Sequence, residues 1–365
     1  MTDKSKKLVI TTDELPDLPL PGTVPQASPG GSPAAGLPSV AGVKPAPMAV
    51  GGFNGLGRLA SLSTVQSSVL AGCIAAILSW PLAELLYTSM DNASAAAITA
   101  VWVGAFGLVF GAVFCSWDDV VAGIRSRIGS SAGIGALVGC VTGAISGVIA
   151  QQIYSSMLES ALANVTTDQE FYDALGSPEL YAARGIAFAV FGLGIGLAVG
   201  MAARSQKKAI NGMVGGLIGG AIGGLVFQFL AVNEIVSAEW LLRLVSMVCL
   251  GTVIGLAIGL VEVARRQAWL QIASGGMAGK EFIVYHEVTE IGSSPKCQIT
   301  LIKDPAIAAQ HCRIIDQNNT RILEALTGAV TVVNGAPITR QQLRSGDLIS
   351  LGGTSIQYSE KATAA

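Results

Sequence analysis

Six apolar runs, each long enough to cross a lipid bilayer, occupy the middle of this 365-residue chain. A helix needs about 20 apolar residues to span the hydrocarbon core, and in lipid it satisfies its own backbone hydrogen-bonding groups. We therefore predict a transmembrane domain over residues 62–264 that contains six helices. The six runs are Val65–Tyr87, Ala95–Ser116, Ala132–Tyr154, Ala182–Ala203, Ala209–Ala231 and Trp240–Ala264.

The composition agrees with an integral membrane protein and disfavours a nucleic-acid binder. Charged residues form 13% of the chain, against about 25% in an average soluble domain. The formal net charge of -2 supplies no basic footprint that could displace phosphate counterions. We expect the lipid bilayer, and no nucleic acid, among the partners.

Charged residues between the runs predict a multi-pass orientation. The loops after the second, fourth and sixth runs are basic, whereas the alternate loops hold acidic residues and no lysine. Because basic loops stay in the cytoplasm, six crossings place both termini there. Trp117–Ile128, apolar on one face, predicts an interfacial helix along the inner surface. The basic loop residues are Arg125, Arg127, Arg204, Lys207, Lys208, Arg265 and Arg266.

Glycines recur every fourth residue in several runs, in the manner of a glycine zipper, as at 135–147 and 212–224. This spacing places them on one stripe of each helix, where neighbouring backbones can approach closely. Similar glycine-striped hairpins repeat along the chain. Two interpretations follow: a tightly packed membrane anchor, or a transporter or channel with a substrate site at the repeat interface.

Three ionisable residues, Glu84, Arg184 and Arg243, lie near the predicted outer ends of the runs. Opposite charges at one depth can pair and so lower the cost of their proximity to lipid. Ion contacts at the membrane edge are one hypothesis, and a permeation or coupling site at Glu84 is the other. No metal-ligand cluster, phosphate loop or nucleophile elbow is found. We expect no metal, no cofactor, no catalytic residue and no enzyme activity.

The two flanks differ in composition from the apolar region. Residues 1–58 hold most of the 14 prolines and lack hydrophobic periodicity, which predicts a disordered Pro/Gly-rich tail. Residues 267–360 instead contain short alternating apolar runs separated by turn residues, which predicts an all-β sandwich. The predicted strands are Trp269–Ile272, Phe282–Tyr285, Gln298–Ile302, Cys312–Ile315, Arg321–Ala325, Val330–Val333, Leu348–Leu351 and Ser355–Tyr358.

Four segments of this region, Glu290–Leu301, Asp304–Ile314, Val333–Gly335 and Leu343–Gly352, occur in the order of landmarks in one known family. Together they make Trp269–Ser359 resemble a forkhead-associated (FHA) domain, the phosphothreonine-reading β-sandwich. No part of the membrane region takes part in the resemblance.

The resemblance implies a role for four residues. His311 matches the histidine that holds the recognition loop in shape, and Asn334 matches the asparagine that contacts the peptide main chain. Gly335 matches the turn partner of that asparagine. Ser294 matches the polar residue that follows the family's usual Gly-Arg pair.

Two positions depart from the family pattern. Ser293 stands where the family has a phosphate-contacting arginine, and Ala308 stands where it has a phosphate-contacting serine. Both changes remove donors to phosphate oxygens. One hypothesis is a weaker anion site formed by Ser293, Ser294 and Lys296 with help from Arg313. The other, which we favour, is a partner without phosphate, or self-association into a homo-oligomer.

These observations predict a membrane protein that displays an FHA domain in the cytoplasm. Its function is recruitment or signalling through a cytoplasmic protein or phosphoprotein partner. The alternative is a transporter or channel whose helical bundle the FHA domain regulates.

Overall fold

The computed structural model describes residues 62–90, 93–163, 166–167, 170, 174–233, 238–302, 304–317, 320–326 and 328–361. All of them belong to one compact unit, residues 51–365. The tail predicted over residues 1–58 lies outside the described residues.

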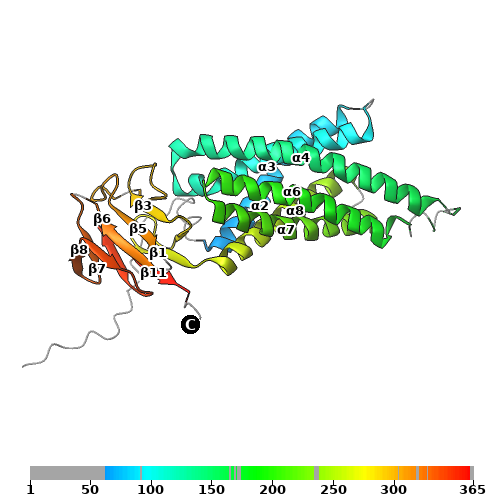
Figure 1. Ribbon diagram of the computed structural model, residues 1–365. Helices are drawn as coiled ribbons and strands as arrows, with labels where there is room; N and C mark the ends of the chain where they lie inside the picture. Colours follow the sequence, from blue (N-terminus) through cyan, green and yellow to red (C-terminus); the bar gives the residue numbers. More distant parts are fainter. Residues whose placement is uncertain are drawn as a thin grey trace, which may run out of the picture. The chain divides into compact units, whose positions relative to one another are not determined.

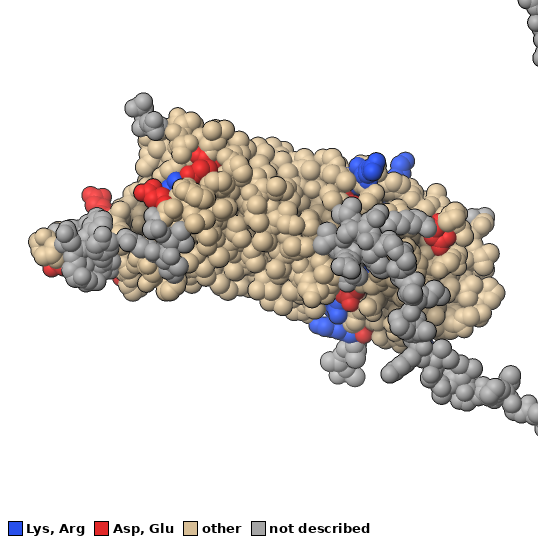
Figure 2. Space-filling model, turned by 180° about the vertical axis from the view of Figure 1, so that it is seen from behind, with Lys and Arg blue, Asp and Glu red and all other residues tan. Residues whose placement is uncertain are grey.

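Within the described ranges, six long helices precede the strands and run side by side in Figure 1. Each contains a stretch that is long and apolar enough to cross a membrane. Figure 2 shows that, on the visible face, the middle of the helices lacks blue and red side chains, which gather at the two ends. The predicted six-helix bundle followed by a β-sandwich is confirmed. The helices are α2 (Thr64–Thr88), α3 (Ala95–Ala122), α4 (Arg125–Leu162), α6 (Pro178–Ala202), α7 (Gln206–Val232) and α8 (Glu239–Arg265).

Three of these helices begin at a serine that caps their first turn. Ser63 accepts a hydrogen bond from the backbone N–H of Gln66 at 3.3 Å, and the Gln66 side chain accepts one from the Ser63 N–H at 3.2 Å. This capping box satisfies donors that would otherwise be unpaired at the start of α2. Ser94 and Ser205 cap α3 and α7 with single bonds of 3.3 and 3.2 Å.

Glycines allow two helical hairpins, α3–α4 and α6–α7, to pack backbone against backbone. A Cβ added to Gly107 of α3 would overlap the carbonyl oxygen of Gly139 in α4. A Cβ on Gly192 of α6 would likewise overlap the carbonyl oxygen of Gly216 in α7. Phe110 and Phe191 fill the space between the helices and are fully buried. The small residues therefore bring the helices close enough for extensive dispersion contacts.

The prediction of an interfacial helix over Trp117–Ile128 is wrong. Helix α3 continues to Ala122 and ends at Gly123, whose φ of 76° is left-handed. The Gly123 N–H donates to the Val120 carbonyl at 3.0 Å, which closes the last turn as a glycine C-cap. Helix α4 then begins at Arg125. Trp117 of this segment is buried in the bundle and donates to Ser67 Oγ at 3.0 Å, and Ile124 is buried against the sandwich core.

Eleven strands follow α8 in the described part of the chain and form two sheets. One sheet has the order β2-β1-β11-β10-β7-β8 and the other β4-β3-β5-β6-β9. Their facing side chains form a core that includes Leu270, Ile314, Leu323, Ile356 and Tyr358. The strands are β1 (Ala268–Ser274), β2 (Glu281–Ile283), β3 (Val288–Gly292), β4 (Ile299–Thr300), β5 (Cys312–Gln317), β6 (Thr320–Ala325), β7 (Thr331–Val333), β8 (Ala336–Ile338), β9 (Arg340–Gln342), β10 (Leu348–Leu351) and β11 (Thr354–Glu360).

The helices and the sandwich meet over a short connection. Only Arg266 and Gln267 separate α8 from β1. Ala122 and Ile124, at the turn between α3 and α4, are buried in the same apolar cluster as the sandwich core. The carbonyl of Arg204, between α6 and α7, lies 3.3 Å from His286 Nε2. Three basic connections of the bundle therefore lie at its sandwich end.

Candidate functional site

The candidate binding residues follow β3 and lie beside the segment that precedes β5. The backbone N–H of Ser293 donates to the Ala308 carbonyl at 2.9 Å, and that of Ser294 donates to the Ala309 carbonyl at 3.0 Å. The Ser293 hydroxyl also donates, to the Ile307 carbonyl at 3.0 Å. The hydroxyl proton of Ser293 is therefore engaged in a hydrogen bond within the loops. Position 293 offers no guanidinium to a ligand.

His311 connects two loops at the same end of the sandwich. Its side chain is 2% exposed. Nδ1 accepts a hydrogen bond from the Ala308 N–H at 3.2 Å, and Nε2 lies 3.0 Å from the Val330 carbonyl. Because Nδ1 acts as the acceptor, we assign the ring proton to Nε2, which then donates to Val330. This geometry holds the segment before β5 against the segment before β7.

Asn334 and Gly335 form the two-residue turn of the β7–β8 hairpin. Both have positive φ, 51° and 84°, as a type I′ turn requires. Asn334 Nδ2 donates to Asp347 Oδ1 at 2.8 Å, and its Oδ1 accepts the Leu348 N–H at 2.9 Å. The residue is exposed, but both ends of its amide are engaged within the sandwich.

The two cations of the candidate site have different surroundings. Arg313 on β5 donates to Glu324 Oε2 at 2.7 Å and also pairs across strands with Glu290. The hydrogen bond to Glu324 raises the pKa of Arg313, and the same bond lowers the pKa of Glu324. Lys296 is exposed and forms no ion pair with another residue that the structure describes. Of the two, Lys296 is therefore the cation available in the loops.

The structure brings two of the three charged membrane candidates together. Arg243 donates to Glu84 through Nη2 at 2.6 Å and Nε at 3.0 Å. Arg184 lies elsewhere, between the rings of Tyr154 and Phe227 at 4.4 and 5.1 Å from its guanidinium carbon. Its Nε is buried and has no hydrogen-bond partner among the residues that the structure describes.

A charged cluster at the junction of helices and sandwich was not predicted. Lys208 Nζ lies 3.8 Å from Glu262 Oε1 and 3.7 Å from Asp118 Oδ2. From the sandwich, Lys280 reaches the Asp118 carbonyl at 3.5 Å, and burial lowers its pKa. These residues are far apart in the sequence, and nothing in their spacing indicates that they meet.

A search for metal ligands covers the described ranges only. There, no group of three or more His, Cys, Asp or Glu side chains is placed to hold a metal ion.

Residues 271–361 match the family model described as "Inner membrane component of T3SS, cytoplasmic domain". The matched range runs from within β1 to one residue beyond β11, so it covers the sandwich and none of the helices. No curated protein matches the chain.

Several of the similar solved structures are described as FHA domains. One, from a study of phosphothreonine-dependent FHA interactions, is 26% identical over 27% of this chain and 99% of its own, with a TM-score of 0.25. The FHA domain of a Chlamydia trachomatis protein is 26% identical over 26% and 99%, with a TM-score of 0.25. The FhaA FHA domain, solved with the intracellular domain of another protein, is 28% identical over 25% and 98%, with a TM-score of 0.23. The predicted FHA-like domain is confirmed.

Proposed function

We propose that this membrane protein uses its FHA-like domain to recruit a cytoplasmic protein partner, and that this recruitment does not require phosphothreonine. The bundle would keep the domain at the membrane surface, because two residues connect α8 to β1. The loops around Ser293, Ala308 and Asn334 would contact the partner. Binding, and not catalysis, is the proposed activity.

The hydrogen bond from Ser293 to the Ile307 carbonyl, 3.0 Å long, is the observation that carries the proposal. A phosphate with nearly two negative charges needs strong donors. The Ser293 hydroxyl already donates to the Ile307 carbonyl. Ala308 has a methyl group where the family pattern has a serine hydroxyl. Arg313 is held by Glu324 on the sheet. Lys296 remains, but its single ammonium does not reproduce a bidentate guanidinium.

The direct test compares peptides with and without phosphate. Full-length protein in detergent would be titrated with paired phosphothreonine and unmodified peptide libraries. We expect the two libraries to bind with similar affinity. Tight, phosphate-selective binding by the natural protein would overturn the proposal, and a concentration-dependent homo-oligomer without peptide binding would point to self-association instead.

A designed gain of phosphate binding provides the second arm. We expect Ser293→Arg with Ala308→Ser to acquire a preference for phosphothreonine of about ten- to a hundredfold, because a charge-assisted hydrogen bond contributes about 1.5–3 kcal/mol. Ser350→Arg with Ala278→Ser is the matched control, since it makes the same chemical changes on β10 and in the turn between β1 and β2, outside the loops proposed to contact the partner. Equal phosphate preference in both variants would show only general electrostatic attraction.

The transporter alternative receives no support from the cavity beside Arg184. That cavity has a volume of about 10 Å³, which is room for about one water molecule. We therefore do not extend the proposal to solute transport.

A further inference from the structure

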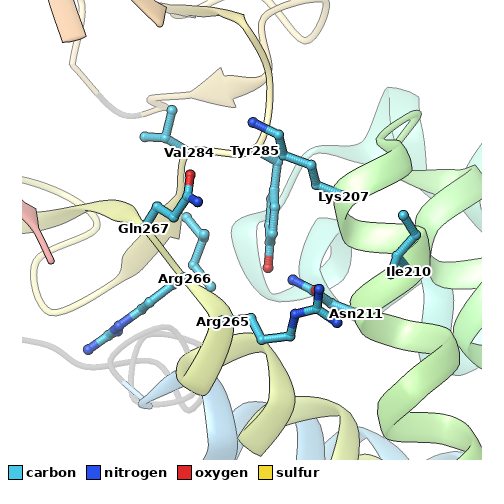
Figure 3. A pocket seen from close by; sticks show the side chains of 9 residues that line it. Lys207, Ile210, Asn211, Arg265, Arg266, Gln267, Val284 and Tyr285 are labelled. Atoms are coloured by element: carbon cyan, nitrogen blue, oxygen red, sulfur yellow. The ribbon is translucent and has the colours of Figure 1, made fainter. Parts of the chain in front are cut away.

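A cavity of about 310 Å³ lies where the start of α7, the end of α8 and the chain after β2 meet. Small-molecule sites have volumes of about 300–1,000 Å³, so the cavity can hold a compact ligand or headgroup. Figure 3 shows side chains from the helices and from the sandwich around it. Three lining residues are basic, Lys207, Arg265 and Arg266, and none is acidic.

Two of these cations are available to a ligand. Arg266 donates to Glu281 at 2.9 Å and stacks over Trp269 at 4.0 Å, and in Figure 3 its side chain points away from the other polar groups. Within the described ranges, neither Lys207 nor Arg265 forms an ion pair. The pocket therefore has two positive charges without a counterion from the described protein.

The nearby acidic group on α8 has a lysine of α7 beside it. Glu262 precedes Arg265 by one helical turn, and its Oε1 lies 3.8 Å from Lys208 Nζ. The positive end of the α7 macrodipole adds to the charge of Lys207, which stands in the first turn of that helix. The local field thus favours an anion.

Two neutral donors complete the pocket. Asn211 is 6% exposed and lines the cavity, and its amide makes no hydrogen bond to another described residue. Tyr285 Oη is buried near Glu262, and Figure 3 shows its ring extending toward Asn211 and Arg265. Burial and the neighbouring Glu262 carboxylate raise the pKa of Tyr285, so the phenol keeps its proton. A buried polar group without a partner is costly, and an anion in the pocket would accept a hydrogen bond from the Asn211 amide.

We propose that this pocket binds a phosphate-bearing anion, held by Lys207, Arg265, Asn211 and Tyr285. Helix α7 begins at Gln206 and α8 ends at Arg265, so the site lies at the boundary of the membrane-spanning helices, at headgroup depth. Ile210 and Ile283 provide an apolar wall. Basic pockets between helix ends commonly bind lipid headgroups, and a free phosphate offers the same chemistry.

The test separates these two sources. Full-length protein in detergent would be titrated with phosphatidylglycerol, with phosphatidylcholine, and with sodium phosphate, and bound ligand counted by native mass spectrometry. Preferential retention of phosphatidylglycerol identifies a lipid headgroup. Saturable binding of inorganic phosphate that displaces the lipid identifies a free anion. Either result supports the site only if it depends on the pocket residues.

Substitutions of the pocket residues test whether anion binding depends on them. We expect Lys207→Gln with Arg265→Gln to weaken anion binding at least about tenfold, because two charge-assisted hydrogen bonds are lost. Arg125→Gln with Arg344→Gln removes the same net charge at exposed positions elsewhere and should leave the affinity unchanged. Tyr285→Phe removes one hydroxyl and should weaken binding several-fold, which keeps the test decisive if the double variant fails to fold. Equal anion binding by natural protein and Tyr285→Phe, or by both double variants, overturns the proposal.

Discussion

Glu84 of α2 and Arg243 of α8 form an ion pair with two hydrogen bonds, although 159 residues separate them in the sequence. Their side chains are 14% and 20% exposed, and the guanidinium carbon of Arg243 lies 4.8 Å from the centre of the Tyr87 ring. The pair therefore joins the first and last helices of the bundle at one end. Its parallel geometry is the bidentate arrangement that arginine favours with carboxylates.

Removal of one partner should destabilise the protein more than removal of both. A mostly buried charge without its counterion costs about 3–5 kcal/mol, whereas replacement of both charges by apolar groups is often close to neutral. We expect Glu84→Leu to lower the free energy of unfolding in detergent by more than the double substitution Glu84→Leu/Arg243→Leu. Additive losses in the double-mutant cycle would show that the two side chains do not interact energetically.

The sequence predicted the bundle well because its determinants are local. Apolar length defines a spanning helix, and glycine at every fourth position defines its contact stripe, so Gly107, Gly139 and Gly216 could be placed before the partner helices were known. Gly123 could also have been recognised as a helix C-cap. The segment Trp117–Ile128, with apolar residues four positions apart at Val120, Ile124 and Ile128, instead suggested a surface helix. The hydrogen bond of Trp117 to Ser67 of α2 is a tertiary contact that the sequence does not display.

Some strands, and the charged cluster where the helices meet the sandwich, depend on tertiary contacts that the sequence does not display. Strands β3, β8 and β9 were missed. Strands β8 and β9 have only three residues each, and β9 contains no apolar side chain. Arg340–Gln342, for example, pairs with Ile322–Glu324 of β6. The candidate loops were located from the family resemblance, whereas the use of the Ser293 hydroxyl by Ile307 and the meeting of Lys208 with Glu262 required the structure.

Two glycines of α4 should respond oppositely to the same substitution. A Cβ on Gly139 would overlap the carbonyl oxygen of Gly107 in α3, whereas a Cβ on Gly133 would meet nothing within 4 Å. We expect Gly139→Ala to destabilise the bundle by about 1–3 kcal/mol through overpacking. Gly133→Ala should be neutral or stabilising by up to about 1 kcal/mol, since alanine favours the helix. Thermal unfolding in one detergent measures both, and equal effects would contradict the close α3–α4 contact.

Asp304 should make the sandwich sensitive to acid. Hydrogen bonds from Thr354 Oγ1 at 2.9 Å and from the Ala306 and Gly353 backbone N–H groups lower the pKa of Asp304. A carboxyl whose pKa is lower in the folded state stabilises the fold above its unfolded pKa, about 3.9. That contribution is lost as the pH falls through the folded pKa.

The variant Asp304→Asn tests the contribution of this carboxyl group alone. Asp304→Asn should reduce stability at neutral pH and flatten the decline of stability below about pH 4, measured as unfolding midpoints across the acid range. Asp316→Asn is a control, because Asp316 forms only a 3.5 Å contact with Arg321. An unchanged acid profile in Asp304→Asn would assign the acid sensitivity to other carboxylates.

The orientation of the bundle provides the last prediction. The basic connections of the bundle lie at the sandwich end, at the turns near Ile124 and Arg204 and at the end of α8. Since basic loops remain in the cytoplasm, we expect the sandwich there. In intact cells, an impermeant maleimide should label Ser156→Cys, near the opposite end of α4, and should leave Ser345→Cys in the sandwich unlabelled until the cells are lysed.

The two native cysteines of the sandwich give little background in this experiment. Burial raises the pKa of Cys312 to about 12 and also raises the pKa of Cys297, so both thiols react slowly. The exposed serines at 156 and 345 tolerate the substitution, because neither side chain is buried. Labelling of Ser345→Cys in intact cells would place the FHA-like domain outside, and recruitment of a cytoplasmic partner would then be untenable.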